Sequence, residues 1–259
     1  MIDQLDRPAP AGALTASLVY GRRALLKIRH QPEQLSDVIF IPVLFTLMFT
    51  YLFGGALSGS TGDYLHFLLP GTLVMSIILV SAFTAVTLHH DFSSGAFDRF
   101  RSLPVWRPAH LAGALLGDAG RYLIASSIVL GLGLLMGYRP DGGVADVLLA
   151  LAVLLLFSSG LAWVWIVIAL VARSPAAVTS ISFLVTFPLT FASNVFVDPA
   201  TMPGWLRAFV DANPVTHLVT TVRDLMAGTT PAGLGWVLLA SVALIAVFAP
   251  LSLHLYRRK

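Results

Sequence analysis

One short stretch of this sequence concentrates side chains that could dock onto a partner molecule. Residues 91–107 (DFSSGAFDRFRSLPVWR) combine charges, aromatic rings and a proline within a strongly apolar chain. Pro104 would end a helix there, because the residue before a proline disfavours the helical conformation. Phe97, Phe100 and Leu103 would lie on one face of such a helix, which would be mainly aromatic. Asp98, Arg101 and Ser102 would lie on a second, charged face. An aromatic face framed by charges predicts docking into a groove of a soluble partner; a solvated loop with a membrane-dipping edge is the alternative.

Residue patterns that support catalysis, metal binding or nucleotide binding are not visible. The phosphate-cradling pattern GxxxxGK[ST] does not occur, and the chain has no cysteine. The seven histidines are scattered, and the adjacent His89 and His90 would point to different sides of a helix. No HExxH pattern and no cluster of carboxylates suited to acid–base chemistry is present. We therefore expect no catalytic residue, metal site or cofactor in this chain, and no nucleic-acid partner.

One pair of opposite charges falls inside an apolar stretch. Asp118 and Arg121 are three residues apart, a spacing that lets the two side chains meet on a helix. Ionisable groups in membrane segments usually pair or face protein. A proton relay would require carboxylates deeper in the membrane, so we predict a structural ion pair.

Composition identifies the elements that must position these residues. Hydrophobic residues make up 57% of the 259 and charged residues 11%, whereas soluble domains average about 25% charged. A helix needs about 20 apolar residues to cross the hydrocarbon core, and barrel-type alternation is absent. The sequence therefore predicts an all-α polytopic membrane protein with six transmembrane helices, near residues 37–54, 65–88, 111–136, 147–171, 176–196 and 234–255.

The positive charges predict the orientation of these spans. Twelve Lys and Arg residues fall on the side of the termini. Three fall on the opposite side, namely Arg139, Arg207 and Arg223. Cytoplasmic segments carry the excess of positive charge, so both termini are expected in the cytoplasm. The expected organisation is a cytoplasmic segment 1–36, a membrane domain 37–255 and a basic tail 256–259.

Two segments outside the spans carry amphipathic patterns. Residues 12–35 mix apolar positions with four bases, which predicts either a helix in the cytoplasmic interface or an ordinary positive flank. Before the last span, Asn213 and Pro214 provide a cap and first-turn proline, and Gly228 provides a stop. This helix carries Arg223, and a second short helix would include Pro203 and Trp205. About 14 residues span roughly 21 Å, so we predict short interfacial or re-entrant helices on the outer face.

Two stretches resemble motifs of a known family. GAFDRFRSLPVWRPAHLAGALLGD (95–118) and MPGWLRAFVDANPVTHLVTTVRDLMAG (202–228) are similar to the stretches after the second span and before the last span of ABC-2 type permeases. The daunorubicin/doxorubicin-resistance (DrrB-like) branch is the nearest match. Both motifs stand in the family's order, so the resemblance covers essentially the whole chain.

The resemblance implies a permease powered by a separate nucleotide-binding ATPase subunit, which would bind ATP and Mg²⁺. Two permease chains, identical or different, would assemble with two ATPase chains in the cell membrane. Residues 12–35 would form an interfacial connecting helix, and 203–227 would cap the outer end of the pathway. The ATPase-coupling residues would be Asp91, Phe92, Gly95, Phe97, Asp98, Arg99, Phe100, Arg101, Leu103 and Pro104.

The expected cargo is a hydrophobic or amphiphilic compound, either a drug or a lipid. It would follow the interface between permease chains, lined by aromatic residues of spans one and five: Phe45, Phe49, Tyr51, Phe183, Phe187 and Phe191. Core packing explains these aromatics equally well. Export of a polysaccharide or lipid-linked glycan is the alternative, and the aliphatic spans argue modestly against it. An ion-coupled transporter would need intramembrane carboxylates and inverted repeats, and a membrane scaffold would not need the charged aromatic segment.

Overall fold

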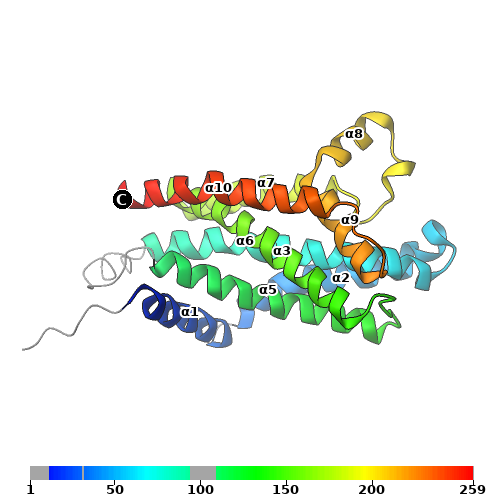
Figure 1. Ribbon diagram of the computed structural model, residues 1–259, viewed down its shortest axis with the longest axis horizontal. Coiled ribbons are helices and arrows are strands. Elements are labelled where there is room, and N and C mark those ends of the chain that lie inside the picture. The colour runs from blue at the N-terminus through cyan, green and yellow to red at the C-terminus, as the bar shows by residue number, and fades with distance from the viewer. Residues whose placement is uncertain (1–11, 31, 94–108, 259) are drawn as a thin grey trace, which may run out of the picture.

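The computed structural model describes residues 12–30, 32–93 and 109–258, and every regular element among them is a helix. Five long apolar helices and one shorter one, α7, run side by side along one axis (Figure 1). They are α2 (Pro32–Ser58), α3 (Thr61–Ser93), α5 (Ala109–Leu135), α6 (Val144–Val171), α7 (Pro175–Phe191) and α10 (Leu234–Arg258). The remaining elements are α1 (Ala13–His30), α8 (Gly204–Ala212), α9 (Pro214–Met226) and a short 3₁₀ turn, η1 (Pro199–Thr201).

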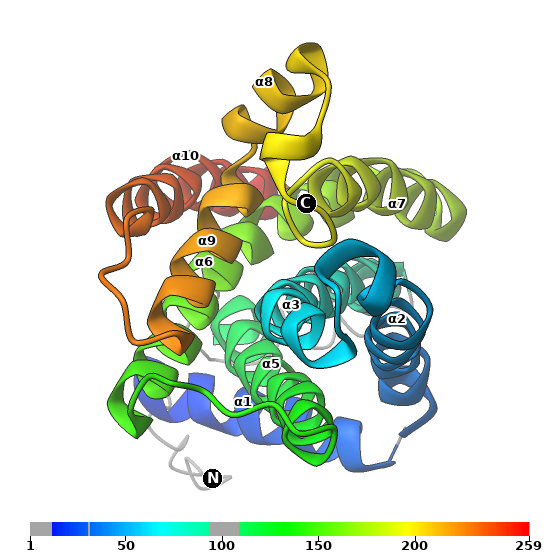
Figure 2. The ribbon, with the colours of Figure 1, turned by 90° about the vertical axis from the view of Figure 1, so that its right-hand side faces the viewer.

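Helix α3 is the centre of the bundle. It packs against α2, α5, α6 and α7, while α10 packs on the far side of α6. Figure 2 looks along the bundle and shows α3 enclosed by its neighbours. Leu68, Val74 and Ile78 of α3 are completely buried. Burial on nearly all sides explains why the α3 sequence is apolar throughout rather than on one stripe.

Five of the described helices are long and apolar enough to cross a membrane: α2 from Ile39, α3, α5 from Leu111, α6, and α10 to Tyr256. Helix α7 is also apolar but has only 17 residues. At 1.5 Å per residue it is about 26 Å long, short of the roughly 30 Å hydrocarbon core.

Helix α7 ends five residues before the end of the predicted fifth span, 176–196. Helix α7 begins where Ser174 accepts a hydrogen bond from the Ala177 N–H and Pro175 occupies the first turn. It ends at Phe191, because Ala192 leaves the helical conformation. Asn213 donates hydrogen bonds to the free carbonyls of Leu189 and Ala192. Residues 192–198 therefore continue as a non-helical segment that folds back on the bundle.

The helix that contains the predicted span 65–88 is longer than the span at both ends. Its last turns remain packed because His89 is buried and its Nδ1 lies 3.0 Å from the Ala169 carbonyl oxygen. Asp91 and Phe92 therefore belong to the end of α3, not to a separate helix that begins at residue 91.

The N-terminal stretch 12–35 is divided between two helices rather than forming one. Helix α1 crosses beneath α5 (Figure 2), and α2 already begins at Pro32. Gly113 of α5 lies directly against Tyr20 of α1, so a side chain there would collide with Tyr20. Leu14 and Leu18 point away from this contact and are 77% and 55% exposed.

The two ends of the bundle differ. The end of α3, the beginning of α5 and the end of α10 lie at one end, on the left of Figure 1. Helices α8 and α9 lie at the opposite end, where α9 crosses over the bundle (Figure 2). The termini of the described chain are thus on the opposite side from α8 and α9.

Candidate functional site

An open groove of about 520 Å³ runs along the bundle between α2, α3 and α7. Its apolar walls come from α2 and α3, through Ile41, Phe45, Met75, Leu79, Ala82, Phe83 and Val86. Its third wall comes from α7, through Thr179, Ser182, Phe183, Thr186, Phe187, Thr190 and Phe191. A volume of 300–1,000 Å³ with mainly apolar walls and few polar groups is typical of a small-molecule site.

Helix α7 presents two different stripes to this groove. Phe183, Phe187 and Phe191 recur every fourth residue and are 67%, 47% and 38% exposed. The rings of Phe187 and Phe191 are stacked, with centroids 4.4 Å apart. The neighbouring stripe carries hydroxyls, of which those of Ser182, Thr186 and Thr190 belong to buried residues and that of Thr179 to an exposed one. A residue spacing of four places successive side chains on one helical face, so the aromatic and hydroxyl stripes lie side by side.

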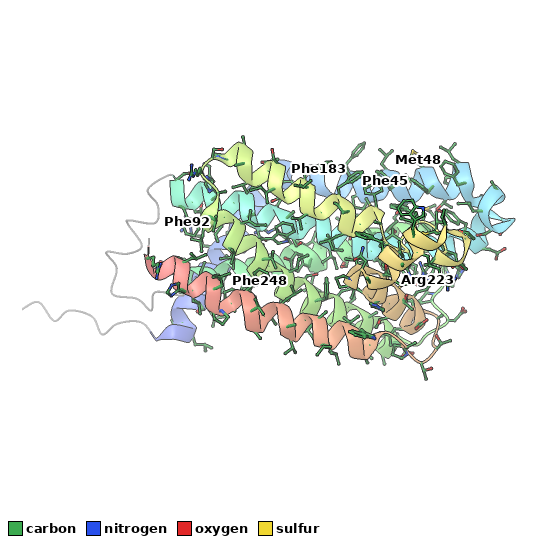
Figure 3. The ribbon with its side chains drawn as sticks, turned by 90° about the horizontal axis from the view of Figure 1, so that it is seen from above. Phe45, Met48, Phe92, Phe183, Arg223 and Phe248 are labelled. Carbon is green, nitrogen blue, oxygen red and sulfur yellow. The ribbon has the colours of Figure 1, made fainter. Side chains whose placement is uncertain are left out.

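Four of the six predicted cargo-path residues line this groove: Phe45, Phe183, Phe187 and Phe191. Figure 3 shows Phe45 of α2 and Phe183 of α7 on the same side of the bundle. Phe49 does not line the groove, but its ring stacks on that of Phe45 with the two ring centroids 5.5 Å apart. Tyr51 is 65% exposed and also lies outside the groove. The structure therefore assembles Phe45, Phe49 and the α7 stripe, and leaves Tyr51 apart.

Phe196 joins Phe45, Phe49 and Phe191 in one aromatic cluster. Phe196 lies in the segment after α7. Its ring centroid is 4.7 Å from that of Phe49, 5.5 Å from that of Phe191 and 5.7 Å from that of Phe45. The cluster extends beyond the groove, because Phe49 and Phe196 are not among the residues that line it. Sequence periodicity could not reveal Phe196, because it follows the end of the helix rather than continuing its repeat.

The backbone of segment 192–198 accepts hydrogen bonds from three side chains outside it. Tyr64 Oη donates to the Phe196 carbonyl oxygen at 2.9 Å. Arg223 Nη2 donates to the Asn194 carbonyl oxygen at 3.2 Å, and Asn213 holds Ala192. Backbone segments that are not helical need such partners within a bundle.

Arg223 of α9 binds backbone and an aromatic ring at the outer end of α3. Its Nε and Nη2 donate to the Phe67 carbonyl oxygen, and its guanidinium carbon is 4.0 Å from the Phe67 ring centroid. Burial lowers the pKa of Arg223 to about 10, an effect opposed by Asp198, Asp224 and Tyr138. The guanidinium therefore stays charged at neutral pH. Because folding lowers this pKa, burial of the charged guanidinium reduces the stability of the folded chain at neutral pH. This loss of stability disappears only as the pH rises above about 10.

The predicted outer helices are present as α8 and α9. Pro203 precedes α8, and its Trp205 is 77% exposed. Asn213 accepts a hydrogen bond from the Val215 N–H, Pro214 fills the first turn, and Gly228 follows α9 with φ of +70°. The cap of α9 was visible in the sequence. The second role of Asn213, as a donor to the end of α7, was not visible.

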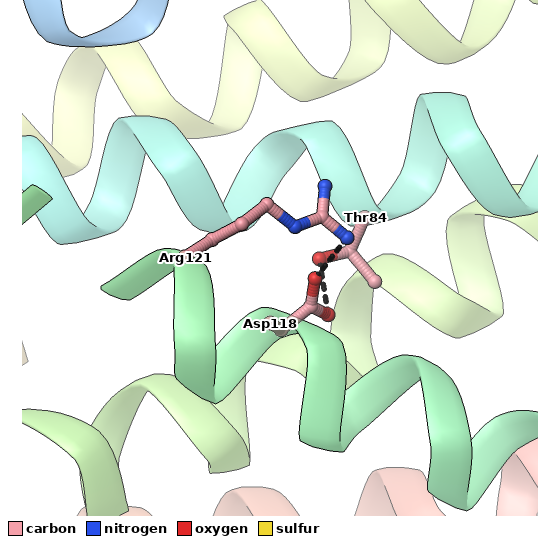
Figure 4. A network of polar contacts seen from close by, with 3 residues as sticks. All are labelled: Thr84, Asp118 and Arg121. Carbon is pink, nitrogen blue, oxygen red and sulfur yellow. Dashed lines mark hydrogen bonds and ion pairs between the residues drawn. The ribbon is translucent and has the colours of Figure 1, made fainter. Parts of the chain in front are cut away.

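Asp118 and Arg121 form an ion pair in α5, with 2.5 Å between Asp118 Oδ1 and Arg121 Nη2. Asp118 Oδ2 also accepts a hydrogen bond from Thr84 Oγ1 of α3 at 2.7 Å (Figure 4). Asp118 is 1% exposed. The carboxylate thus connects α3 and α5, the two helices on either side of residues 94–108. Thr84 was not recognised in the sequence, because it lies 34 residues away without a distinctive neighbour.

Most of the predicted ATPase-coupling residues, from Gly95 to Pro104, lie outside the described residues. Asp91 and Phe92 are described and occupy the end of α3. The Phe92 ring lies 6.2 Å from the ring of Tyr256 of α10. Figure 3 shows Phe92 at the opposite end of the bundle from Arg223.

Comparison with known proteins identifies the class of molecule. The family model for the ABC-2 type transporter matches residues 16–227. The daunorubicin resistance ABC transporter permease protein DrrB1 of Streptomyces coeruleorubidus is 48% identical over 98% of this chain and 90% of its own length. A probable doxorubicin resistance ABC transporter permease of Mycobacterium tuberculosis is 26% identical over 82% of this chain and 77% of its own length. A putative transport permease of Cyanophora paradoxa is 24% identical over 79% of this chain and 71% of its own length.

The chain belongs to the ABC-2 type transporter family. It is a transport component and a multi-pass protein of the cell membrane, as its relatives and its five long apolar helices indicate. The resemblance read from residues 95–118 and 202–228 is confirmed at the level of the family.

Proposed function

We propose that this chain is the permease subunit of an ATP-driven exporter that moves a hydrophobic or amphiphilic drug or lipid out of the cytoplasm or inner leaflet. The observation that carries this proposal is the apolar, aromatic groove between α2, α3 and α7. It occurs in a chain whose relatives are named as daunorubicin and doxorubicin resistance permeases. An apolar groove suits a ligand that partitions into lipid, because burying its apolar surface is favourable without many polar contacts.

The energy source in this proposal is a separate ABC ATPase that binds ATP and Mg²⁺ and carries out the hydrolysis. The segment from Asp91 to Pro104 would bind that subunit, through an aromatic face and a charged face. Asp91 and Phe92 at the end of α3 would transmit the displacement directly into the central helix. Because α3 also forms one wall of the groove, movement at its end could change the groove.

The proposed membrane topology has six spans with both termini in the cytoplasm. The fifth span would be α7 together with residues 192–198, since α7 alone has 17 residues. Helices α8 and α9 would be interfacial or re-entrant on the outer side. Helix α1 would lie in the cytoplasmic interface, with its exposed Leu14 and Leu18 toward lipid and its bases toward anionic headgroups.

A second permease chain, identical or different, would complete the pathway. The outer surface of α7 supports this proposal, because Phe183 and Leu184 are 67% and 71% exposed. Lipid covers such side chains in a monomer, whereas a second chain would close the open side of the groove.

The test is purification of the chain with its co-encoded ATPase, followed by ATP turnover in liposomes with candidate cargos. We expect a stable complex whose ATP turnover rises with hydrophobic aromatic compounds. Failure of any ATPase subunit to co-purify would remove the central idea. Stimulation by a lipid-linked glycan alone would replace the proposed cargo with the alternative.

A further inference from the structure

The last four turns of α3 are bonded to neighbouring helices through side chains that do not line the groove. Trp165 Nε1 of α6 donates to Ser81 Oγ at 2.8 Å, and both residues are buried. One turn later, Thr84 Oγ1 donates to the Asp118 carboxylate of α5 (Figure 4). Helix α3 is therefore already bonded to α5 and α6 before its final two turns.

His89 adds a bond between the end of α3 and the end of α6. Its Nδ1 lies 3.0 Å from the Ala169 carbonyl oxygen, and a carbonyl can only accept, so Nδ1 is the donor. Ala169 belongs to the last turn of α6, which ends at Val171. The final carbonyls of a helix have no partner within the helix itself. His89 thus satisfies a carbonyl of α6 from a buried position on α3.

Tyr256 connects the same end of α3 to α10, although α10 packs on the far side of α6. The ring centroids of Tyr256 and Phe92 are 6.2 Å apart, with the two planes inclined by 57°. Aromatic rings attract each other at this separation and inclination. Tyr256 is only 8% exposed, although just two residues of α10 follow it. This burial indicates that the last turn of α10 packs inward.

The side of α3 that faces the groove is different over the same turns. It presents Ala82, Phe83 and Val86, which meet the walls formed by α2 and α7. Apolar contacts are not directional, so they resist sliding less than hydrogen bonds do. Packed helices can slide past one another by small distances. A displacement at the end of α3 would therefore carry α5, α6 and α10 with it, and would shift all four helices against α2 and α7.

We infer that His89 and Tyr256 are positioning residues for energy coupling, because they fasten the end of α3 to α6 and α10. Neither residue touches cargo or ATP in this proposal. Their role is to make four helices respond as one unit to a push on α3, so that the groove changes along its whole wall. This inference rests on the proposed function, in which an ATPase acts at the end of α3.

The first test measures transport per ATP hydrolysed in liposomes, for the full chain with its co-encoded ATPase and with daunorubicin as the transported probe. Tyr256→Ala and His89→Leu are each expected to lower this ratio about threefold to tenfold, the effect of losing one ring contact or one hydrogen bond. ATPase co-purification should not change. Tyr256→Phe keeps the ring and His89→Asn keeps a donor, so both should restore at least half of the ratio. A residue that only stabilised the fold would lower the yield and leave the ratio unchanged.

Leu251→Ala is the matched control on α10, because Leu251 is 40% exposed and lies one to two turns before Tyr256. It should leave the ratio unchanged. The inference is overturned if Tyr256→Ala and His89→Leu keep a normal ratio, if Leu251→Ala lowers it equally, or if the Phe and Asn variants restore nothing. Loss of ATPase association in the variants would also overturn it, because the two residues would then belong to the ATPase contact.

The second test follows backbone amide hydrogen exchange and does not require any variant to fold. In the unmodified complex, a non-hydrolysable ATP analogue should change exchange at the ends of α3, α6 and α10 together, since local opening reports how firmly each end is held. A change confined to α3 would contradict the fastening. In the chain alone, Tyr256→Ala and His89→Leu should raise exchange over residues 85–93, and Leu251→Ala should not.

The two tests distinguish failure of this inference from failure of the proposed function. If no ATPase co-purifies, the proposed function falls, and the coupling role of His89 and Tyr256 falls with it. If the complex transports normally but the variants keep both their coupling ratio and their exchange over residues 85–93, the proposed function stands and only the fastening is removed.

Discussion

At the scale of single residues, Asp118 is a buried charge with partners on two helices. It is almost completely buried and contacts a cation on its own helix and a hydroxyl on α3. A buried charge is stabilised only while its partners remain, and removal of one partner leaves the other uncompensated. The pair therefore contributes to the position of α5 against α3 more than to net stability.

We predict that Asp118→Asn lowers the free energy of unfolding by about 3 kcal/mol, because Arg121 would remain largely buried without its counter-ion. The double variant Asp118→Asn with Arg121→Gln should recover most of this loss, since neither charge remains. Thermal unfolding of the purified chain in detergent measures both. A double variant as unstable as the single one would contradict the ion-pair explanation.

The matched control is the exposed ion pair on α8. Arg207 and Asp211 are 3.7 Å apart and both more than half exposed. Asp211→Asn removes the same kind of charge from a solvated pair, and the expected change is within about 0.5 kcal/mol. A similar loss at both sites would mean that burial of Asp118 has no special effect.

At the scale of elements, the connection after α7 depends on a close approach at one glycine. A Cβ atom on Gly71 of α3 would lie 2.7 Å from the Val195 carbonyl oxygen. We predict that Gly71→Ala pushes the segment 192–198 away from α3, moves Phe196 out of the aromatic cluster, and destabilises the chain by roughly 1–3 kcal/mol. Since the chain has no cysteine, the rate of thiol labelling at Val195→Cys reports the displacement, and it should rise.

Gly131→Ala on α5 is the control for this change, because no atom lies within 4 Å of its added Cβ. In the Val195→Cys background, Gly131→Ala should leave the rate of thiol labelling unchanged. The stability of this variant should be the same as that of the unmodified chain or slightly higher. Unchanged labelling in Gly71→Ala would show that the segment does not rest on that glycine.

The same elements show how far sequence could predict the fold and the site. Long apolar runs predicted the six helices, and Asn213 with Pro214 predicted the start of α9. The end of α7 could not be predicted, because apolar residues continue beyond it and Asn213, 24 residues away from Leu189, supplies the terminating hydrogen bonds. The groove was partly predicted through its phenylalanines. Its hydroxyl stripe was missed, because only tertiary packing distinguishes a bonded threonine such as Thr179 from an unbonded one such as Thr186.

At the scale of the whole molecule, α3 extends between the two ends of the bundle. It ends at Ser93, just before residues 94–108, and near its start the Phe67 carbonyl accepts hydrogen bonds from Arg223. Its 33 residues are about 50 Å long at 1.5 Å each. Along the way it forms one wall of the groove and receives the Thr84–Asp118 hydrogen bond. A continuous buried helix can carry a displacement from one end of the bundle to the other, provided that a partner binds the two positions with different affinity.

We predict that Phe97→Ala together with Arg101→Ala abolishes ATPase association or uncouples ATP hydrolysis from transport, while membrane insertion stays intact. Loss of an aromatic anchor and its neighbouring charge typically removes several kcal/mol of binding, enough for at least a hundredfold weaker association. Co-purification of the ATPase measures association, and transport per ATP hydrolysed measures coupling. Phe209→Ala with Arg207→Ala on α8 changes the same residue types at the opposite end of the bundle and should leave ATPase association unchanged. Normal association and normal coupling in the Phe97/Arg101 variant would exclude this segment as the contact, and the ends of α3 and α10 near Phe92 and Tyr256 would then be the next surface to test.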